Sequence, residues 1–217
     1  MLGRAAVAMW WDIPLEAKAE WEDWHSHEHM PERLGIPSFL RGSRWVALSG
    51  EPSYFVLYET ARLAAIMSGP YLERLNNPTP WSRKMMPHHR NMVRSLCRVR
   101  ASFGGGLGQA IATIRFSPAP RGGRALVQRL ASEVLPELPG GKGLSGAHLL
   151  ESQPAVSTPQ TTEQKIRGGD AHADWVLLVC GYDVDAVRAA TGGLQLPGAV
   201  AELYRLAYSM TPKDLPR

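Results

Sequence analysis

The alternation of hydrophobic and polar positions predicts two similar series of strands and helices along the chain. The first series is expected as strand, helix, strand, strand, helix and strand over residues 5–11, 15–34, 39–48, 54–59, 61–75 and 92–100. The second repeats this order over residues 110–116, 122–135, 144–150, 175–180, 184–191 and 203–209. Apolar runs rich in Val, Ile, Tyr and Trp and bounded by Gly or Pro favour the strands. Residues 125–135 keep the spacing of an amphipathic helix.

The two series also share local sequence. LRGSRWV (40–46) and LSGAHLL (144–150) carry Leu and Gly in register, and an aromatic residue opens the apolar run in both PSYFVLYET (52–60) and ADWVLLVCG (173–181). Each series has the β-α-β-β-α-β order of ferredoxin-like domains. We therefore expect an α+β fold with two such repeats, residues 1–102 and 110–217.

A four-stranded antiparallel sheet with both helices on one face leaves its other face bare and apolar. Two such sheets in one chain can cover each other, which predicts a β-barrel wrapped in helices. The glycine-rich segment FGGGLGQ (103–109) joins the repeats. It precedes a strand and opens no helix, so we interpret it as a flexible linker rather than a phosphate-binding loop.

The repeats differ in their connections. The second carries a long insert at residues 151–173, which we expect to be a lid or a disordered loop without secondary structure. The first has the extended segment NNPTPWSRKMMPHHRN (76–91) before its last strand and is the only repeat with a histidine-rich helix. Any site built on that helix should be asymmetric.

Composition and charge narrow the class of protein. The 217 residues are 44% hydrophobic and 20% charged, as in ordinary globular domains, and no apolar run approaches the length of a membrane-spanning helix. The net charge of +4 comes from scattered arginines, so no nucleic-acid or membrane partner is expected. The N-terminus lacks a clear cleavage site, which favours a first strand in a cytoplasmic protein. Cys97 and Cys180 lie in apolar runs and are expected to be buried thiols.

The stretch WEDWHSHEHMPERL (21–34) is the most unusual part of the chain. At 100° per residue, Ala17, Trp21, Trp24 and Glu28 fall on one helical stripe, and the tryptophans mark that stripe as buried. Glu28 would then point inward. A buried carboxylate needs a partner, and the expected partners are His25 or an arginine from a strand.

Pro31 interrupts this helix. It lacks an N–H group, and its ring clashes with the carbonyl four residues earlier, at His27, so the helix is expected to kink or restart there. A kink beside His29 could turn that ring toward the sheet. The angles projected beyond Glu28 therefore depend on the kink.

Three interpretations of the histidines remain open. They could favourably cap a helix end, or His25 and His29, four residues apart, could share a metal ion. The histidine-glutamate-x-x-histidine order is absent and no third ligand is evident, so we predict no metal site and no cofactor. One histidine could instead serve as a general acid or base, since the imidazole pKa lies near neutrality.

The run WEDWHSHEHMPERLGIPSFLRGSRW, followed by a short turn and YFVLYE, resembles the EthD-like branch of the dimeric α+β-barrel superfamily. The matching positions are Trp21 to Trp24, Glu28, His29, Pro31, Glu32, Arg33, Pro37 and Phe39. The resemblance covers the first hundred residues and extends to the second half only in layout. It implies an intramolecular version of the dimeric α+β barrel. Relatives include cofactor-independent monooxygenases of aromatic polyketides, lactone isomerases and haem-dependent peroxidases, with the ligand between the sheet and its helices.

The candidate site residues follow from the geometry of the histidine-rich helix and from the family resemblance. We predict His29 or His25 as the acid or base, with Glu28 orienting it. The candidate substrate-binding residues are Trp24, Trp45, Tyr58, His88 and Arg167. The aromatic residues could instead pack in the core, His88 and His89 could lie in a solvated loop, and Arg167 could be a surface charge.

The leading hypothesis is a cofactor-independent monooxygenase, cyclase or isomerase that acts on an aromatic or polyketide-like compound. The alternatives are a noncatalytic small-molecule-binding or structural protein, and a haem- or metal-binding protein. The expected partner is a small-molecule ligand. A homodimer of two such pseudo-dimers is a further expectation.

Overall fold

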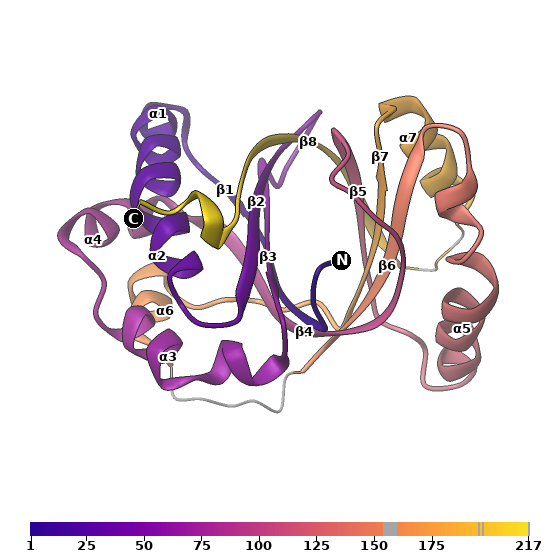
Figure 1. Cartoon of the computed structure of the whole chain (residues 1–217), viewed down its shortest axis with the longest axis horizontal. Helices are drawn as coiled ribbons and strands as arrows, with labels where there is room; N and C mark the ends of the chain where they lie inside the picture. The colour runs from indigo at the N-terminus through magenta and orange to yellow at the C-terminus, as the bar shows by residue number, and fades with distance from the viewer. Residues whose placement is uncertain (154–159, 195, 197, 217) are drawn as a thin grey trace.

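The computed structural model of the chain describes residues 1–153, 160–194, 196 and 198–216. Within these residues, strands β1 to β8 close into a barrel in the order β1-β3-β2-β8-β5-β7-β6-β4 (Figure 1). The strands are β1 (Ala5–Asp12), β2 (Phe39–Ala47), β3 (Tyr54–Thr60), β4 (Arg90–Gly104), β5 (Ala110–Phe116), β6 (Leu144–Ser152), β7 (Trp175–Gly181) and β8 (Val200–Met210).

Helices flank the barrel on two opposite sides (Figure 1). One side carries α1 (Leu15–Trp24), α2 (Met30–Leu34), α3 (Gly69–Asn76), α4 (Pro80–Met85) and α6 (Thr162–Arg167). The other carries α5 (Gly123–Arg129) and α7 (Val184–Gly192). Two π-helical segments, His25–His29 and Leu130–Val134, follow α1 and α5, and short 3₁₀ turns lie at 63–67, 86–88, 138–140 and 212–214. No helix in the described ranges is long and apolar enough to span a bilayer.

The two halves have the same topology. The first sheet runs β4-β1-β3-β2 and the second runs β8-β5-β7-β6, and every pairing is antiparallel. The sheets join edge to edge, with β2 paired to β8 and β4 paired to β6. The α+β barrel built from two ferredoxin-like repeats is thus confirmed. The inner faces of both sheets form one continuous interior.

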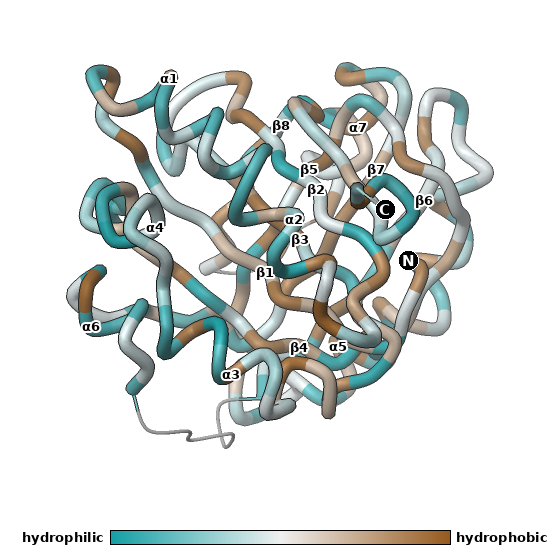
Figure 2. The backbone as a smooth tube through the Cα atoms, turned by 60° about the vertical axis from the view of Figure 1, so that its left-hand side comes forward, coloured by the Kyte–Doolittle hydropathy of each residue, from teal (hydrophilic) through white to brown (hydrophobic). Residues whose placement is uncertain are grey.

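Strand alternation divides the core into layers. On β1, Ala6, Ala8 and Trp10 point into the barrel interior, while Met9 and Trp11 face the helices. Hydrophobic residues follow the central strands, whereas outer helices such as α1 and α4 are largely hydrophilic (Figure 2). A third apolar cluster fills the space between the second sheet and its helices.

Several connections differ from the sequence prediction. Phe103 and Gly104 end β4, because the barrel closure pairs them with β6, so the linker begins two residues later than predicted. The insert was predicted to lack secondary structure, but it contains α6, which starts with a capping box between Thr161 and Gln164. Residues 154–159 of the insert lie outside the described residues. The division into residues 1–102 and 110–217 stays a prediction.

The segment at 76–91 also contains a helix that the sequence prediction missed. Thr79 caps α4 by accepting a hydrogen bond from the Ser82 amide, and Pro80 occupies the first turn. The helix predicted at 61–75 is divided at Ser68, which caps α3 and separates it from a 3₁₀ turn. Of these short helices, α3 contributes Tyr71 and Leu75 to the site described next, and α4 packs against α1.

Candidate active site

The helix-covered faces of the two sheets are chemically different. Behind the second sheet the buried side chains are apolar, as with Leu130, Leu149 and Val187. Behind the first sheet, His25 and Arg33 are buried among aromatic and aliphatic residues. The site is therefore asymmetric, because within the described residues this cluster of buried polar groups lies behind the first sheet and not behind the second.

The π-helical segment decides where the histidines point. The amide of Met30 donates to the carbonyl of His25, five residues earlier, and this wider turn carries the helix past Pro31, which has no amide hydrogen to donate. The helix changes from α to π geometry and restarts as α2 with the proline in its first turn. His25 and His29 consequently lie on the same buried face, with ring centroids 5.5 Å apart.

Tryptophan rings hold the two imidazoles in place. His25 packs against Trp21, with ring centroids 5.0 Å apart, and His29 packs against Trp24 at 4.6 Å. Trp11 from β1 closes the group from the sheet side. The predicted buried stripe of Trp21 and Trp24 is confirmed, since neither is exposed to solvent.

A small cavity of about 30 Å³ lies between this helix and the sheet, large enough for one or two water molecules. Side chains from β1, β3, β4, α2, α3, α6 and the π-helical segment surround it. We call it the histidine cavity. Its histidine, tyrosine and charged lining residues are His25, His29, Arg33, Tyr58, Tyr71, His89, Arg94, Glu163 and Arg167.

Several polar atoms beside the histidine cavity have no hydrogen-bond partner among the described residues. They are both ring nitrogens of His25, Nδ1 of His29, the Tyr58 hydroxyl and Nε1 of Trp11. Buried polar groups are nearly always paired in folded proteins, because an unpaired group loses its hydration without compensation. This concentration of unpaired groups marks the cavity as a place where a polar guest would be stabilised.

Burial keeps the imidazoles neutral. Desolvation holds the pKa of His25 well below its usual value, and the nearby Arg44 guanidinium lowers it further. Desolvation also lowers the pKa of His29, with Arg33 as the next cause, and brings the pKa of His89 down to about 3. At neutral pH each ring therefore offers one N–H donor and one unprotonated nitrogen.

His89, rather than His88, contributes to the histidine cavity. The Nε2 atom of His89 accepts a hydrogen bond from the Trp21 indole at 3.2 Å, and its Nδ1 then donates to the Met86 carbonyl at 3.1 Å. His88 is partly exposed and does not line the cavity. His88 was the residue selected from the sequence, but the orientation of the two rings depends on the 3₁₀ turn at 86–88, which no local pattern predicted.

Charged residues form one wall of the histidine cavity, and part of this wall comes from the second half. The Arg33 guanidinium is ion-paired with Glu163 of α6, and Arg167 pairs with Asp170 at 2.9 Å. Figure 1 shows α6 beside the helices of the first repeat, although it belongs to the connection between β6 and β7. Arg167 and Tyr58 both line the cavity, and their substrate-binding roles stay predictions.

Glu28 does not meet the partners expected for it. Its carboxylate accepts hydrogen bonds from Trp24 Nε1 at 3.1 Å, Thr79 Oγ1 at 2.5 Å and Ser82 Oγ at 3.3 Å. The prediction of His25 or a strand arginine as its partner was wrong. The π-helical turn changes the direction of the helix face, so Glu28 is turned toward α4.

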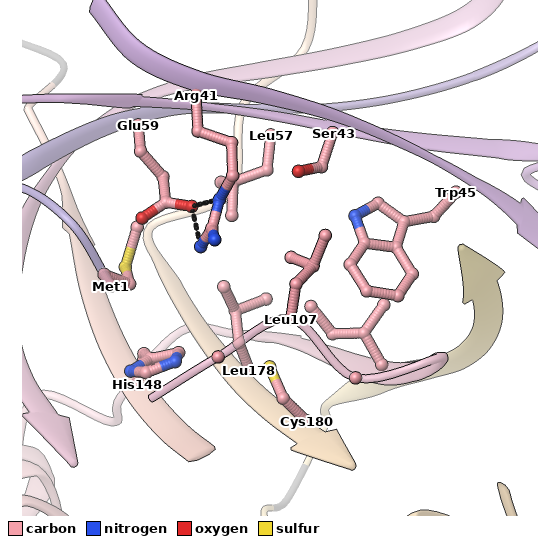
Figure 3. Close-up of a pocket in the computed structure, with 13 residues that line it drawn as sticks. Met1, Arg41, Ser43, Trp45, Leu57, Glu59, Leu107, His148, Leu178 and Cys180 are labelled. Atoms are coloured by element: carbon pink, nitrogen blue, oxygen red, sulfur yellow. Dashed lines mark hydrogen bonds and ion pairs between the residues drawn. The ribbon is translucent and has the colours of Figure 1, made fainter. Parts of the chain in front are cut away.

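Trp45 lies in a different part of the molecule from the histidine cavity. It points into the barrel interior, beside a pocket of about 20 Å³ that also contains Leu178 and the ion-paired Arg41 and Glu59 (Figure 3). Its neighbour Arg44 packs over the Trp21 ring on the helix-covered face. Because successive strand residues face opposite ways, Trp45 has to point inward, and its placement with the other site candidates was wrong.

In the portion of the chain that the structure describes, no three or more His, Cys, Asp or Glu side chains are grouped so that they could hold a metal ion. Both cysteines are buried, and burial raises their thiol pKa values to about 12. Neither thiol is therefore activated as a nucleophile at neutral pH.

Comparison with known proteins supports the fold. No protein-family model matches the sequence, and no curated protein matches it either. Among solved structures, an anthrone oxidase-like protein aligns with a TM-score of 0.63 and 7% identity over 97% of this chain and 93% of its own. A proposed monooxygenase from Fusobacterium nucleatum aligns at 0.60 with 8% identity, over 97% and 96% of the two chains. Another from Lactobacillus acidophilus aligns at 0.59 with 7% identity over 97% of each chain.

At this level of identity the likeness establishes a shared architecture. This chain shares the α+β-barrel fold of these solved structures. The aligned lengths agree closely, so the likeness extends over both repeats of this chain. Reaction and substrate must be argued from the site itself.

Proposed function

We propose that this protein is a small-molecule enzyme of the monooxygenase-like type, with its substrate bound in the histidine cavity. An aromatic or polyketide-like compound is the preferred substrate class, and a cyclase or isomerase reaction would use the same groups. The observation that carries the proposal is the buried His25 imidazole, which lines the cavity with neither nitrogen hydrogen-bonded among the described residues. Such a group is costly in a core and useful in a site that binds or deprotonates a ligand.

The same proposal places the chain in the EthD-like branch of the superfamily. The support is the sequence run from Trp21 to Phe39, which contains the tryptophan-acidic-tryptophan start, His29 and Pro31. This run forms the helix that covers the histidine cavity. The residues that carry the resemblance therefore also cover the cavity.

We assign the role of proton acceptor to His29 or His25. Each imidazole is neutral and can take a proton from an acidic C–H or O–H bond of a substrate. Their lowered pKa values make them weak bases in the free protein. The negative charge left on the substrate would raise those values in the complex and favour the transfer. In an oxygenase the substrate anion would then react with dioxygen, and in an isomerase the imidazolium would return the proton to another atom.

Glu28 takes a positioning role in this proposal rather than a direct one. It fixes the Trp24 indole by accepting its N–H, and Trp24 packs on the His29 ring. The carboxylate thereby orients the histidine through the tryptophan. Thr79 and Ser82 supply the other hydrogen bonds to Glu28 and tie α4 to the same unit.

Binding of an aromatic substrate requires the histidine cavity to enlarge. A volume of about 30 Å³ holds one or two water molecules, and an aromatic ring needs several times that space. The element proposed to move is α6, because it belongs to a connection rather than to the barrel, and Arg167 and Glu163 on it form part of the cavity wall. We therefore assign α6 as the cover of the site.

A noncatalytic binding or structural role is the second candidate. The small volume of the histidine cavity favours it, since the first sheet and its helices are already well packed. In that case the unpaired histidine nitrogens would be hydrogen-bonded to one or two water molecules. The two candidates differ in whether an organic molecule is retained.

Native mass spectrometry of the purified protein, followed by extraction and identification of any retained molecule, is the test. The expected result is an organic ligand in the unmodified protein and its loss from the His25→Ala and His29→Ala variants. His27→Ala is the matched control, because this side chain is 71% exposed on the same helix. With the ligand in hand, oxygen uptake and product formation are measured for each variant. Unchanged turnover in both His25→Ala and His29→Ala would remove the assigned roles.

A further inference from the structure

Arg94 of β4 is a cavity-lining cation without a carboxylate partner among the described residues. Its guanidinium donates to the Tyr71 hydroxyl at 2.9 Å and makes no ion pair within 4.0 Å in that part of the chain. The two other lining arginines are neutralised locally. Arg33 pairs with Glu32 and Glu163, and Arg167 pairs with Asp170.

The uncharged groups around the histidine cavity add to this donor excess. Trp11 Nε1 can only donate, the Tyr58 hydroxyl can donate, and a neutral His25 ring has one N–H group. The main hydrogen-bond acceptors left around the cavity are the unprotonated nitrogens of the histidines. A guest rich in acceptor oxygens would satisfy more of these groups than water or a neutral hydrocarbon.

We propose that the histidine cavity binds the anionic head group of a small organic acid, with Arg94 as the charge partner. This inference rests on the proposed function and names the substrate class of the same site. The carboxylate oxygens accept hydrogen bonds from Arg94 and from the indole and imidazole N–H groups around them. A carboxylate alone is small enough to enter with little rearrangement, and the attached apolar part lies toward the aliphatic and aromatic lining once α6 has moved.

Arg94 should discriminate between an acid and the corresponding amide by charge alone, because the two compounds have the same shape. Benzoate and benzamide have the same number of heavy atoms, but only benzoate carries a charge at neutral pH. A charge-assisted hydrogen bond in a partly buried site is stronger than one between neutral groups. We therefore expect benzoate to bind about tenfold or more tightly than benzamide.

The experiment measures dissociation constants of benzoate and benzamide by ligand-observed NMR at constant ionic strength. Arg94→Gln is expected to weaken benzoate binding about tenfold and to leave benzamide binding unchanged, while Arg94→Lys restores part of the difference. Arg98→Gln is the matched control, because it removes the same charge from an exposed position on the same strand. A thermal unfolding midpoint close to that of the unmodified protein shows that each variant is folded.

The outcomes separate this inference from the proposed function. Equal affinities for benzoate and benzamide, with both lost in His25→Ala, would overturn the anionic head group and leave the proposed site intact. Benzoate binding that is equally strong in Arg94→Gln would overturn the role of Arg94. If neither compound binds, the anion subsite is rejected, and ligand retention in the native mass spectrum then decides the proposed function separately.

Discussion

Arg33 and Glu163 form a buried ion pair although 130 positions separate them in the sequence. Arg33 belongs to the histidine helix of the first repeat, and Glu163 belongs to the insert of the second. Both side chains are about 3% exposed. This pair links the cover of the candidate site to the helix that carries its histidines, so the two repeats depend on each other at the site as well as in the barrel.

Replacing Glu163 with Gln should destabilise the protein, because it leaves the Arg33 charge buried without its principal partner. A loss of about 3–5 kcal/mol in the free energy of unfolding is expected from urea denaturation. The control is Asp185→Asn, which breaks an exposed pair with Arg188 and should cost less than about 1 kcal/mol. A double variant, Arg33→Met with Glu163→Leu, should be more stable than Glu163→Gln. A cost below 1 kcal/mol for Glu163→Gln alone would contradict a structural role for the pair.

Stability should decrease as the pH falls below about 6.5. His25, His29 and His89 have pKa values in the folded protein below their ordinary value, so in acid the unfolded chain binds protons that the folded chain does not. Their stabilisation is fully present above pH 6.5 and is lost progressively as the pH falls toward the folded values, about 3 for His89. For His89, whose pKa in the folded protein is about 3, the cost should be about 2 kcal/mol at pH 5, and His25 and His29 should add to it in the same direction.

Urea denaturation between pH 7.5 and 5 measures this dependence. His89→Gln should flatten the pH slope by the share of one histidine, while His27→Ala, an exposed position, should leave the slope as it is. A protein equally stable at pH 5 and 7.5 would mean that the imidazoles are protonated in the folded state.

Glu28 should matter for the packing of Trp24 more than for proton transfer. Glu28→Ala removes the acceptor shared by Trp24, Thr79 and Ser82, and we expect a loss of about 1–3 kcal/mol in stability. The near-ultraviolet circular dichroism of the tryptophans should change with it. Glu20→Ala, at an exposed position of the same helix, provides the comparison and should have little effect on either measurement. An unchanged spectrum in Glu28→Ala would contradict the positioning role.

Trp45 and Trp11 should behave differently when each is shortened to Phe. Trp45 is buried in the barrel interior, so Trp45→Phe should lower stability by about 1–3 kcal/mol and leave benzoate binding unaffected. Trp11 lines the histidine cavity, so Trp11→Phe should weaken binding as well. Reduced benzoate affinity in Trp45→Phe, with stability intact, would place Trp45 at the ligand site after all.

The sequence by itself determined the order of the barrel strands and the two-repeat architecture. Period-two alternation on strands such as β1 and β3 is a local property, and it specifies which side chains share a face before any partner strand is known. The same rule requires Arg44 and Trp45 to face opposite sides of β2. The buried tryptophans of the histidine helix could also be predicted, since helical periodicity holds over the regular turns that precede His25.

Only the tertiary structure decided what the histidines face. Pro31 predicts a disturbance, but the π-helical turn that absorbs it, and so the direction of Glu28, depends on packing against α4 and the sheet. Glu163 and Arg167 line the cavity because the connection between β6 and β7 packs against the helices of the first repeat. Short-range sequence patterns do not encode that long-range packing. Backbone pairing that many sequences can satisfy closes the barrel, whereas contacts between distant residues decide which face of it encloses a site.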